Sequence, residues 1–91
     1  MHCQEFEYRN HCLLRIIERE ISVDDIEIVL KTGEVIKEYL NDKPYPSFLI
    51  LGFVKNRALH VVAALFNETC IVITAYYADN GKWMKDFKTK R

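Results

Sequence analysis

The sequence contains few of the residues that mark several common kinds of functional site. Its three glycines, Gly33, Gly52 and Gly81, lie far apart, so they form no glycine-rich phosphate-binding loop. The longest apolar run, from Phe48 to Val54, is too short to cross a bilayer. The first ten residues lack the apolar segment of a signal peptide. We therefore expect one domain, residues 1–91, in the cytoplasm, with no membrane partner.

Cysteine is also sparse. An odd count of three is not typical of a disulfide framework, and Cys70, which lies in an apolar segment, is expected to be a small core residue. The adjacent pairs His2–Cys3 and His11–Cys12 invite a metal interpretation, but their spacing matches no familiar zinc pattern. We therefore expect neither a metal nor a cofactor.

Charge is balanced overall but unevenly distributed along the chain. Residues 1–42 hold five basic residues against ten acidic ones, whereas residues 43–91 hold eight against three. The last ten residues, KWMKDFKTKR, include five basic residues and one acidic residue. This asymmetry indicates an anionic partner near the C-terminus. A solvated basic tail is an equally good interpretation, because a neutral protein has no general attraction for nucleic acid.

The first third of the chain predicts two helices. Apolar residues recur at spacings near three, four and seven between Phe6 and Ile21, which predicts a helix over residues 5–20. Ser22 and Asp25 approximate a capping box and begin a second helix. Gly33 ends it, since glycine tolerates the left-handed conformation that often follows a helix. Residues 5–32 are therefore expected to form a helical hairpin.

Four later segments predict β-strands, because they are short, rich in branched and aromatic residues, and separated by polar pairs or by a proline-containing loop. They are residues 34–40, 47–54, 57–66 and 69–77. A helical hairpin can cover only one face of such a sheet, so the C-terminal segment or a partner must cover part of the other. The expected fold is α+β, an N-terminal helical hairpin packed on a four-stranded antiparallel sheet.

Arg57 and His60 are unusual residues for the central apolar strands. Metal-free RNA cleavage needs a base for the 2′-hydroxyl proton, an acid for the departing 5′-oxygen and a cation for the phosphate charge. Histidine can take either proton role near neutral pH, and aromatic rings stack on unpaired bases. The candidate catalytic residues are His60, Arg57, His11, Arg15 and Tyr76, and the candidate RNA-binding residues are Lys82, Trp83, Lys85, Lys88, Lys90 and Arg91.

A structural interpretation competes with the catalytic one at each position. A lone histidine in an apolar strand is more often a hydrogen-bonded core residue, and Arg57 can simply follow a hairpin turn. His11 and Arg15, four residues apart, can belong to a solvated helix face. Arg57 and His60 are three residues apart, so a regular strand directs them to opposite faces.

The register of the last hairpin decides which tyrosine lies near His60. A two-residue loop at Asn67–Glu68 pairs His60 with Ala75 and places Tyr77 on its face. A shift of one residue exchanges Tyr77 for Tyr76, so the sequence leaves this assignment open.

Several motifs resemble those of a known family. They are HCLLRIIER at 11–19, DDIE at 24–27, DKPYPS at 42–47, RALHVV at 57–62, TAYYAD at 74–79 and WMKDF at 83–87. Together they cover nearly the whole chain and resemble the bacterial domain of unknown function 4258. The segments RxLHVV and YxxD followed by WxxDF are the most specific. The resemblance makes seven residues motif positions without assigning them a catalytic role: His11, Arg15, Arg57, His60, Tyr76, Trp83 and Asp86.

The resemblance also implies a fold and a function. Genes of that family often lie beside a zinc-finger antitoxin similar to MqsA, and the family is held to be related to the RelE, ParE, BrnT and MqsR toxins. Those toxins have a small antiparallel sheet with a helical hairpin. RelE, BrnT and MqsR cleave mRNA, whereas ParE poisons DNA gyrase. One departure is that many such toxins are basic, whereas this chain has a pI of about 6.8.

The implied function is that of a toxin of a type II toxin–antitoxin system, acting as a metal-independent endoribonuclease on mRNA, free or on the ribosome. Its partners would be RNA and a cognate antitoxin, which can carry a zinc finger. Two alternatives remain open. One is a non-catalytic protein of the same fold that inhibits gyrase or another partner by docking. The other is an orphaned, inactive toxin-like domain.

Overall fold

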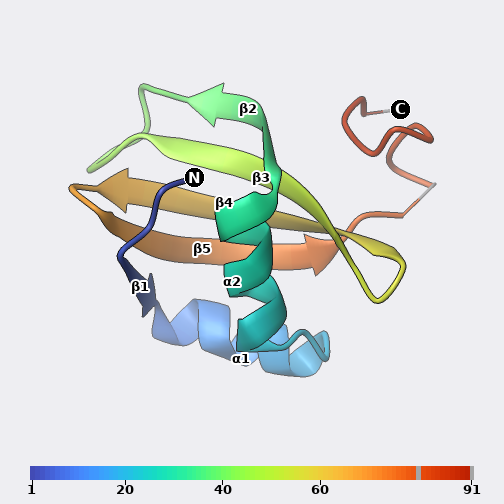
Figure 1. Cartoon of the computed structure of the whole chain (residues 1–91), viewed down its shortest axis with the longest axis horizontal. Helices are drawn as coiled ribbons and strands as arrows, with labels where there is room; N and C mark the ends of the chain where they lie inside the picture. Colours follow the sequence, from blue (N-terminus) through green and yellow to red (C-terminus); the bar gives the residue numbers. More distant parts are fainter. Residues whose placement is uncertain (80, 91) are drawn as a thin grey trace.

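The computed structural model describes residues 1–79 and 81–90 and shows three long strands at the centre of one sheet (Figure 1). These are β3 (Ser47–Val54), β4 (Arg57–Phe66) and β5 (Thr69–Tyr77), paired antiparallel in that order. Lys55 and Asn56, between β3 and β4, both have positive φ values, 53° and 62°, as a tight hairpin turn requires. All three strands predicted for this region are confirmed.

Two further strands complete the sheet at its edges. β2 (Glu34–Tyr39) pairs antiparallel with β3, and β1 (Glu5–Tyr8) pairs parallel with β5, giving the order β1-β5-β4-β3-β2. The fold class is α+β, as predicted, but the sheet has five strands and is mixed. The predicted helix over residues 5–20 is wrong at its start. Glu5–Tyr8 alternates exposed and half-buried residues, which is the pattern of a strand covering the edge of β5.

The two helices pack on one face of this sheet. α1 (Asn10–Glu18) runs along β5, and α2 (Val23–Thr32) crosses β3 and β4 (Figure 1). α1 buries Cys12 and Ile16, whereas Ile17, predicted to lie in its apolar stripe, is 71% exposed. The helices therefore do not begin the chain as a hairpin. They follow an edge strand, and this shifts which residues of α1 face the sheet.

The predicted boundaries of α2 are confirmed, but the reason for its end differs from the expected one. The Ser22 hydroxyl accepts a hydrogen bond of 3.1 Å from the Asp25 backbone N–H, which caps the helix. Gly33 has φ −77° and ψ 176°, an extended conformation open to any residue. A Cβ atom at Gly33 would lie 2.5 Å from the Val29 carbonyl oxygen and 2.6 Å from that of Leu51. Glycine is needed here because α2 and β3 approach closely.

The main core lies between the helices and the sheet. Its central side chains, which are at most 2% exposed, are Ile16, Ile26, Leu30, Ile50, Leu59, Val61 and Val72. Alternate residues of the strands, such as Leu49, Leu51 and His60, face the opposite side. The C-terminal segment, residues 81–90, folds back over part of this second face, because the Phe87 carbonyl contacts His60. This confirms the expectation that the tail covers part of the second face.

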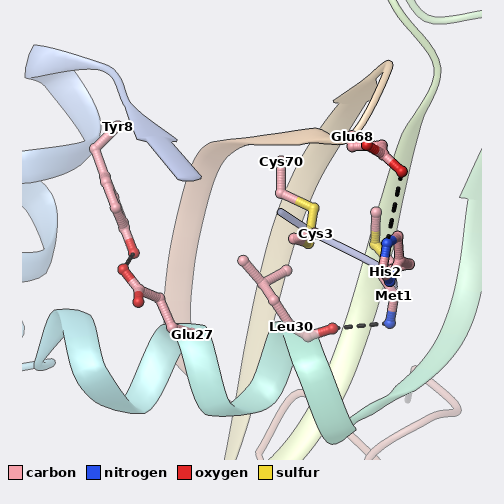
Figure 2. Close-up of a disulfide and its surroundings, with 8 residues drawn as sticks. All are labelled: Met1, His2, Cys3, Tyr8, Glu27, Leu30, Glu68 and Cys70. Atoms are coloured by element: carbon pink, nitrogen blue, oxygen red, sulfur yellow. Dashed lines mark hydrogen bonds and ion pairs between the residues drawn. A yellow bond between two sulfur atoms is a disulfide. The ribbon is translucent and has the colours of Figure 1, made fainter. Parts of the chain in front are cut away.

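A disulfide joins Cys3 to Cys70 and ties the N-terminal segment to the start of β5 (Figure 2). The N-terminal amine of Met1 donates to the Leu30 carbonyl at 2.8 Å, so the same N-terminal segment is also attached to α2 (Figure 2). The cysteine count predicted no disulfide framework, and this one bond between Cys3 and Cys70 was not expected; Cys12 is unpaired and buried. Cys70 is also fully buried, as expected of a core residue. The pairing escaped sequence analysis because it depends on β1 lying beside β5.

Candidate functional site

A cleft of about 410 Å³ opens where α1, β5 and the C-terminal segment meet. We call it the Tyr76 cleft. Its lining residues come from three separate parts of the chain and include three basic side chains. They are Arg19, Tyr76, Tyr77, Asp79, Lys82, Trp83 and Lys90. The cleft therefore combines cations and aromatic rings, the two kinds of group that bind single-stranded nucleic acid.

Behind the cleft lies His60, which is fully buried. Its Nε2 atom lies 2.7 Å from the Phe87 carbonyl oxygen, and its Nδ1 atom lies 3.2 Å from the Tyr76 hydroxyl. A carbonyl oxygen can only accept, so Nε2 carries the proton and Nδ1 accepts the hydrogen bond of Tyr76. Burial lowers the pKa of His60, and the hydrogen bond to Phe87 opposes this effect only in part. The resting imidazole is therefore neutral.

Tyr76 connects this buried histidine to the cleft. Burial is the main cause that raises the pKa of Tyr76; Tyr39 adds to the effect, and the positive charge of Arg19 opposes it. The phenol is thus protonated at neutral pH and donates its proton to His60. Its oxygen lone pairs stay available to accept a proton or a hydrogen bond. A bound molecule in the cleft would meet Tyr76 first and His60 only through Tyr76.

Arg19, at the C-terminal end of α1, is the cation that the sequence analysis missed. Its Nη1 donates to the Ala75 carbonyl at 2.8 Å and to the Thr74 hydroxyl at 3.2 Å. These bonds hold the guanidinium beside Tyr76, and its remaining N–H groups can bind an anion. The sequence placed Arg19 on a solvated helix face. Two weak signals were available: Arg19 is the last residue of the motif HCLLRIIER, and the positions i+3 and i+4 from it hold Ser22 and Val23 and no acidic residue.

The acidic group of the cleft is already engaged by the backbone. Asp79 Oδ1 accepts from the backbone N–H groups of Gly81 at 2.8 Å and Lys82 at 3.0 Å. The described lining contains this one carboxylate and three basic side chains, those of Arg19, Lys82 and Lys90, so its formal charge is +2. The charge of the described lining therefore favours an anion over a cation.

Trp83 forms a wall of the cleft and packs against the sheet. It is 6% exposed, and its ring meets the His60 ring edge to face at a centroid distance of 4.4 Å. Its backbone N–H donates to the Asp79 carbonyl at 3.0 Å, and it pairs with Lys90. Trp83 is a candidate RNA-binding residue by sequence, but its burial and its contact with His60 favour packing on the sheet.

The structure does not bring the five candidate catalytic residues together. Arg57 is exposed at the end of the β3–β4 hairpin, where its guanidinium lies 3.6 Å above the Tyr77 ring. It lines a separate shallow cleft with Phe53 and Phe87. Leu59 belongs to the core on the helix side, so strand alternation places Arg57 on that side and His60 on the other, as their spacing indicated. His11 lies at the start of α1, beside another pocket. Arg15 pairs with Glu18 at 3.6 Å.

The predicted RNA-binding residues of the tail also separate into groups. Lys82 and Lys90 line the Tyr76 cleft. Lys88 forms a 2.9 Å ion pair with Glu34 on β2, and Lys85 is exposed. Arg91 lies outside the described residues. Asp86, a motif position, accepts backbone hydrogen bonds from residues 88 and 89, and these lower the pKa of its carboxyl group.

The described residues were also compared with what a metal site and a membrane-spanning helix require. Among residues 1–79 and 81–90, no three His, Cys, Asp or Glu side chains are placed to hold a metal ion together. None of the helices described here has the length and apolar character needed to cross a membrane.

Comparison with known proteins identifies one family. The family model described as "Domain of unknown function (DUF4258)" matches residues 8–77, which include both helices, strands β2 to β5 and Tyr76. No curated protein and no solved structure matches the chain significantly. Because the match covers well over half of the sequence, the chain belongs to the DUF4258 family.

Proposed function

We propose that this protein is the toxin of a type II toxin–antitoxin system and that it cleaves mRNA as a metal-independent endoribonuclease. The observation that carries the proposal is the Tyr76 cleft, where a hydrogen-bonded Tyr76–His60 pair lies beside three basic side chains. The small sheet with two helices on one face also agrees with a relationship to the RelE, ParE, BrnT and MqsR toxins.

In this proposal the cations of the cleft bind the scissile phosphate. Arg19, Lys82 and Lys90 neutralise the charge that grows on its oxygens as the 2′-oxygen attacks. This assigns to Arg19 the role that sequence analysis gave to Arg57, because Arg19 lies beside Tyr76 and Arg57 does not.

Tyr76 and His60 remove the proton from the nucleophile. The Tyr76 oxygen accepts the 2′-hydroxyl proton while its own proton moves to Nδ1 of His60, and the 2′-oxygen forms a bond to phosphorus. The bond from phosphorus to the 5′-oxygen breaks, and that oxygen takes a proton from the ammonium group of Lys82 or Lys90. The products are a 2′,3′-cyclic phosphate and a free 5′-hydroxyl. His60 acts through Tyr76 and does not touch RNA.

The test compares two tyrosines of the same cleft. Tyr76→Phe removes the hydroxyl that is hydrogen-bonded to His60. Tyr77→Phe removes a hydroxyl that does not belong to the Tyr76–His60 pair, and it keeps the ring over which Arg57 lies. Purified wild-type protein should cut single-stranded RNA in the presence of EDTA and leave 2′,3′-cyclic ends. Tyr76→Phe should reduce the rate by about 100-fold or more, the usual size of an acid–base contribution, while Tyr77→Phe stays active. Cleavage by Tyr76→Phe at the wild-type rate would refute the proposed mechanism.

The toxin role has its own test in cells. Induced expression of the wild-type chain should stop growth, the neighbouring antitoxin gene should restore it, and Tyr76→Phe should be harmless at equal soluble expression. Normal growth with the wild-type chain would remove the toxin proposal and leave the orphaned domain. Such a toxin acts in the cytoplasm, where thiols are kept reduced, so the disulfide would be open there.

A docking protein is the second candidate, and one observation favours it. Leu14 and Ile17 on α1 are 62% and 71% exposed, and Phe53 on β3 is 63% exposed. A contiguous exposed apolar patch often marks a protein interaction site, and Leu14 and Ile17 are neighbours on the surface of α1, three residues apart. Growth arrest with intact cellular RNA would favour this candidate, in which the target is gyrase or another protein.

A further inference from the structure

A second pocket, of about 310 Å³, lies at the opposite end of α1 from the Tyr76 cleft. We call it the Tyr45 pocket. Its sides are the start of α1, where Arg9 and His11 lie, and the loop before β3, which contributes Lys43 and Tyr45. The proposed chemistry at the Tyr76 cleft uses none of these side chains, although His11 is a motif position of the family.

The floor of the Tyr45 pocket is an apolar patch of the sheet. Ala64 on β4 pairs with Ile71 on β5, and their neighbours Ala63 and Val72 belong to the core on the helix side. Side chains alternate along a strand, so Ala64 and Ile71 face away from α2. Ile73 lies next to the irregularity in the β4–β5 pairing and is 43% exposed. Ala64 and Ile71 are already buried, so a flat ligand on this floor would mainly cover the apolar side chain of Ile73.

Tyr45 forms a firm wall beside this floor. Its ring stacks on Phe66 with a centroid distance of 4.5 Å and an interplanar angle of 29°. The stacking holds the ring in place before any ligand binds, so little side-chain entropy is lost on binding. Rigid aromatic walls of this kind bind the flat faces of nucleobases.

The rim of the pocket favours an anion. Arg9 and Lys43 lie on it, and the one acidic lining residue, Asp42, accepts a hydrogen bond from the Ser47 hydroxyl. Arg9 is the N-cap residue of α1, and among the described residues its side chain makes no capping bond. The first turn of α1 has no acidic residue to offset the positive end of the helix dipole. One phosphate can therefore bind Arg9, Lys43 and the free backbone N–H groups in the first turn of α1 together.

We propose that the Tyr45 pocket binds one nucleotide of a single-stranded RNA, with its base on the apolar floor beside Tyr45 and its phosphate at Arg9, Lys43 and the start of α1. This inference rests on the proposed ribonuclease function. Arg9 and Arg19 flank α1 ten residues apart, about 15 Å along a helix. A few nucleotides of extended RNA span that distance. The Tyr45 pocket then selects a base a short way along the strand from the phosphate cut in the Tyr76 cleft.

The first test measures nucleotide binding without cleavage. The four ribonucleoside monophosphates are titrated into wild-type protein and followed by amide NMR shifts, with ribose 5-phosphate as a probe that lacks the base. Shifts should concentrate at Tyr45, Ala64 and Ile71 and be smaller in α2. Ribose 5-phosphate should bind about tenfold more weakly, because it lacks the stacking of the base. Equal binding of both probes, or shifts confined to the Tyr76 cleft, would overturn the inference.

Matched variants then separate the pocket from the rest of the surface. Ile73→Trp fills the pocket, whereas Ile28→Trp makes the same change at an exposed position of α2 outside it. Arg9→Ala removes a rim cation, whereas Arg15→Ala removes one that pairs with Glu18. Ile73→Trp and Arg9→Ala should each lower nucleotide affinity by about tenfold, with circular dichroism unchanged, and the two control variants should bind as wild type.

The outcomes distinguish this inference from the function on which it rests. Ile73→Trp should also change which RNA sequences are cut, while Ile28→Trp keeps the wild-type preference. If Ile73→Trp cuts RNA with the same sequence preference as wild type, the pocket assignment is overturned and the ribonuclease proposal stands. If the protein binds nucleotides in the Tyr45 pocket but cuts no RNA, the ribonuclease proposal fails and the pocket assignment stands. If Ile73→Trp abolishes antitoxin binding and leaves nucleotide binding intact, the pocket belongs to a protein partner.

Discussion

The hydroxyl of Tyr76 and Nδ1 of His60 lie 3.2 Å apart, and the two residues are direct partners across β4 and β5. The other ring nitrogen of His60 donates to Phe87, in a segment that follows the sheet in sequence and covers its second face. One buried imidazole therefore joins the cleft residue Tyr76 to the C-terminal segment. A change at His60 should affect both the chemistry of the cleft and the stability of the fold.

Replacing His60 by glutamine should lower the free energy of unfolding by about 1–3 kcal/mol. Both ring nitrogens of this fully buried residue are hydrogen-bonded, and a glutamine amide would leave Tyr76 or Phe87 with a poor partner. Urea denaturation measures the change, with His11→Gln, at an exposed position, as the control that stays near wild type. The variant should remain folded, lose RNA cleavage and still bind antitoxin. An unfolding curve identical to wild type would contradict the hydrogen-bonded arrangement.

The stability of the protein should fall as the pH drops below about 6.5. Burial lowers the pKa of His60 beneath the ordinary histidine value of about 6.5. Between the folded and the ordinary pKa, the unfolded chain binds more protons than the folded chain, so acidification through this window favours unfolding. Comparing urea midpoints at about pH 7.5 and about pH 5.5 measures the effect. His60→Gln should lose less stability than wild type over this interval, and parallel losses would show that His60 does not titrate in this way.

Most of the strands and the second helix could be predicted because their signals are local. The polar pair Lys55–Asn56 marks a tight turn, and Ser22 followed by Asp25 marks a cap; both have the predicted structure. The strand Glu5–Tyr8 was missed because four alternating residues that lead into α1 also fit a helix, and only pairing with the distant β5 decides between them. Such long-range pairing is not encoded in a local pattern.

The candidate site was predicted less completely, for a related reason. The register between β4 and β5 shifts at Val62 and Ala63, so His60 pairs with Tyr76 where a regular two-residue loop would give Ala75. No glycine or proline marks this irregularity in the sequence, although a one-residue shift changes which side chain meets His60. Arg19 joined the cleft only because α1 lies along β5, which is again a tertiary relationship.

Breaking the disulfide should destabilise the fold. The bond between Cys3 and Cys70 closes a loop with a sequence separation of 67 residues, and it holds the segment that leads into the short strand β1 (Figure 2). Cys3→Ser should lower the free energy of unfolding by about 2–4 kcal/mol, since the unfolded chain gains freedom. Oxidised wild-type protein treated with dithiothreitol should approach the variant, and the variant itself should not respond. Equal urea midpoints for oxidised and reduced wild-type protein would contradict this expectation.

The lysines of the C-terminal segment should differ in their effect on RNA binding. Lys82 and Lys90 line the Tyr76 cleft, Lys85 is exposed elsewhere, and Lys88 pairs with Glu34. A lysine that contacts a phosphate of single-stranded RNA contributes a slope of about −0.7 to the plot of log affinity against log salt concentration. Lys82→Ala and Lys90→Ala should therefore each weaken binding and flatten this slope by about that amount.

Lys85→Ala is the matched control for these variants, since it removes the same charge from the same segment without touching the cleft. Single substitutions are preferable to removal of residues 88–91, because Thr89 accepts a backbone bond from Met84 and Lys90 pairs with Trp83, so truncation would also disturb the wall of the cleft. Fluorescence anisotropy of a labelled RNA at several salt concentrations gives both the affinity and the slope. If Lys85→Ala flattens the slope as much as Lys82→Ala does, the basic segment attracts RNA through its overall charge and the Tyr76 cleft is not the phosphate-binding site.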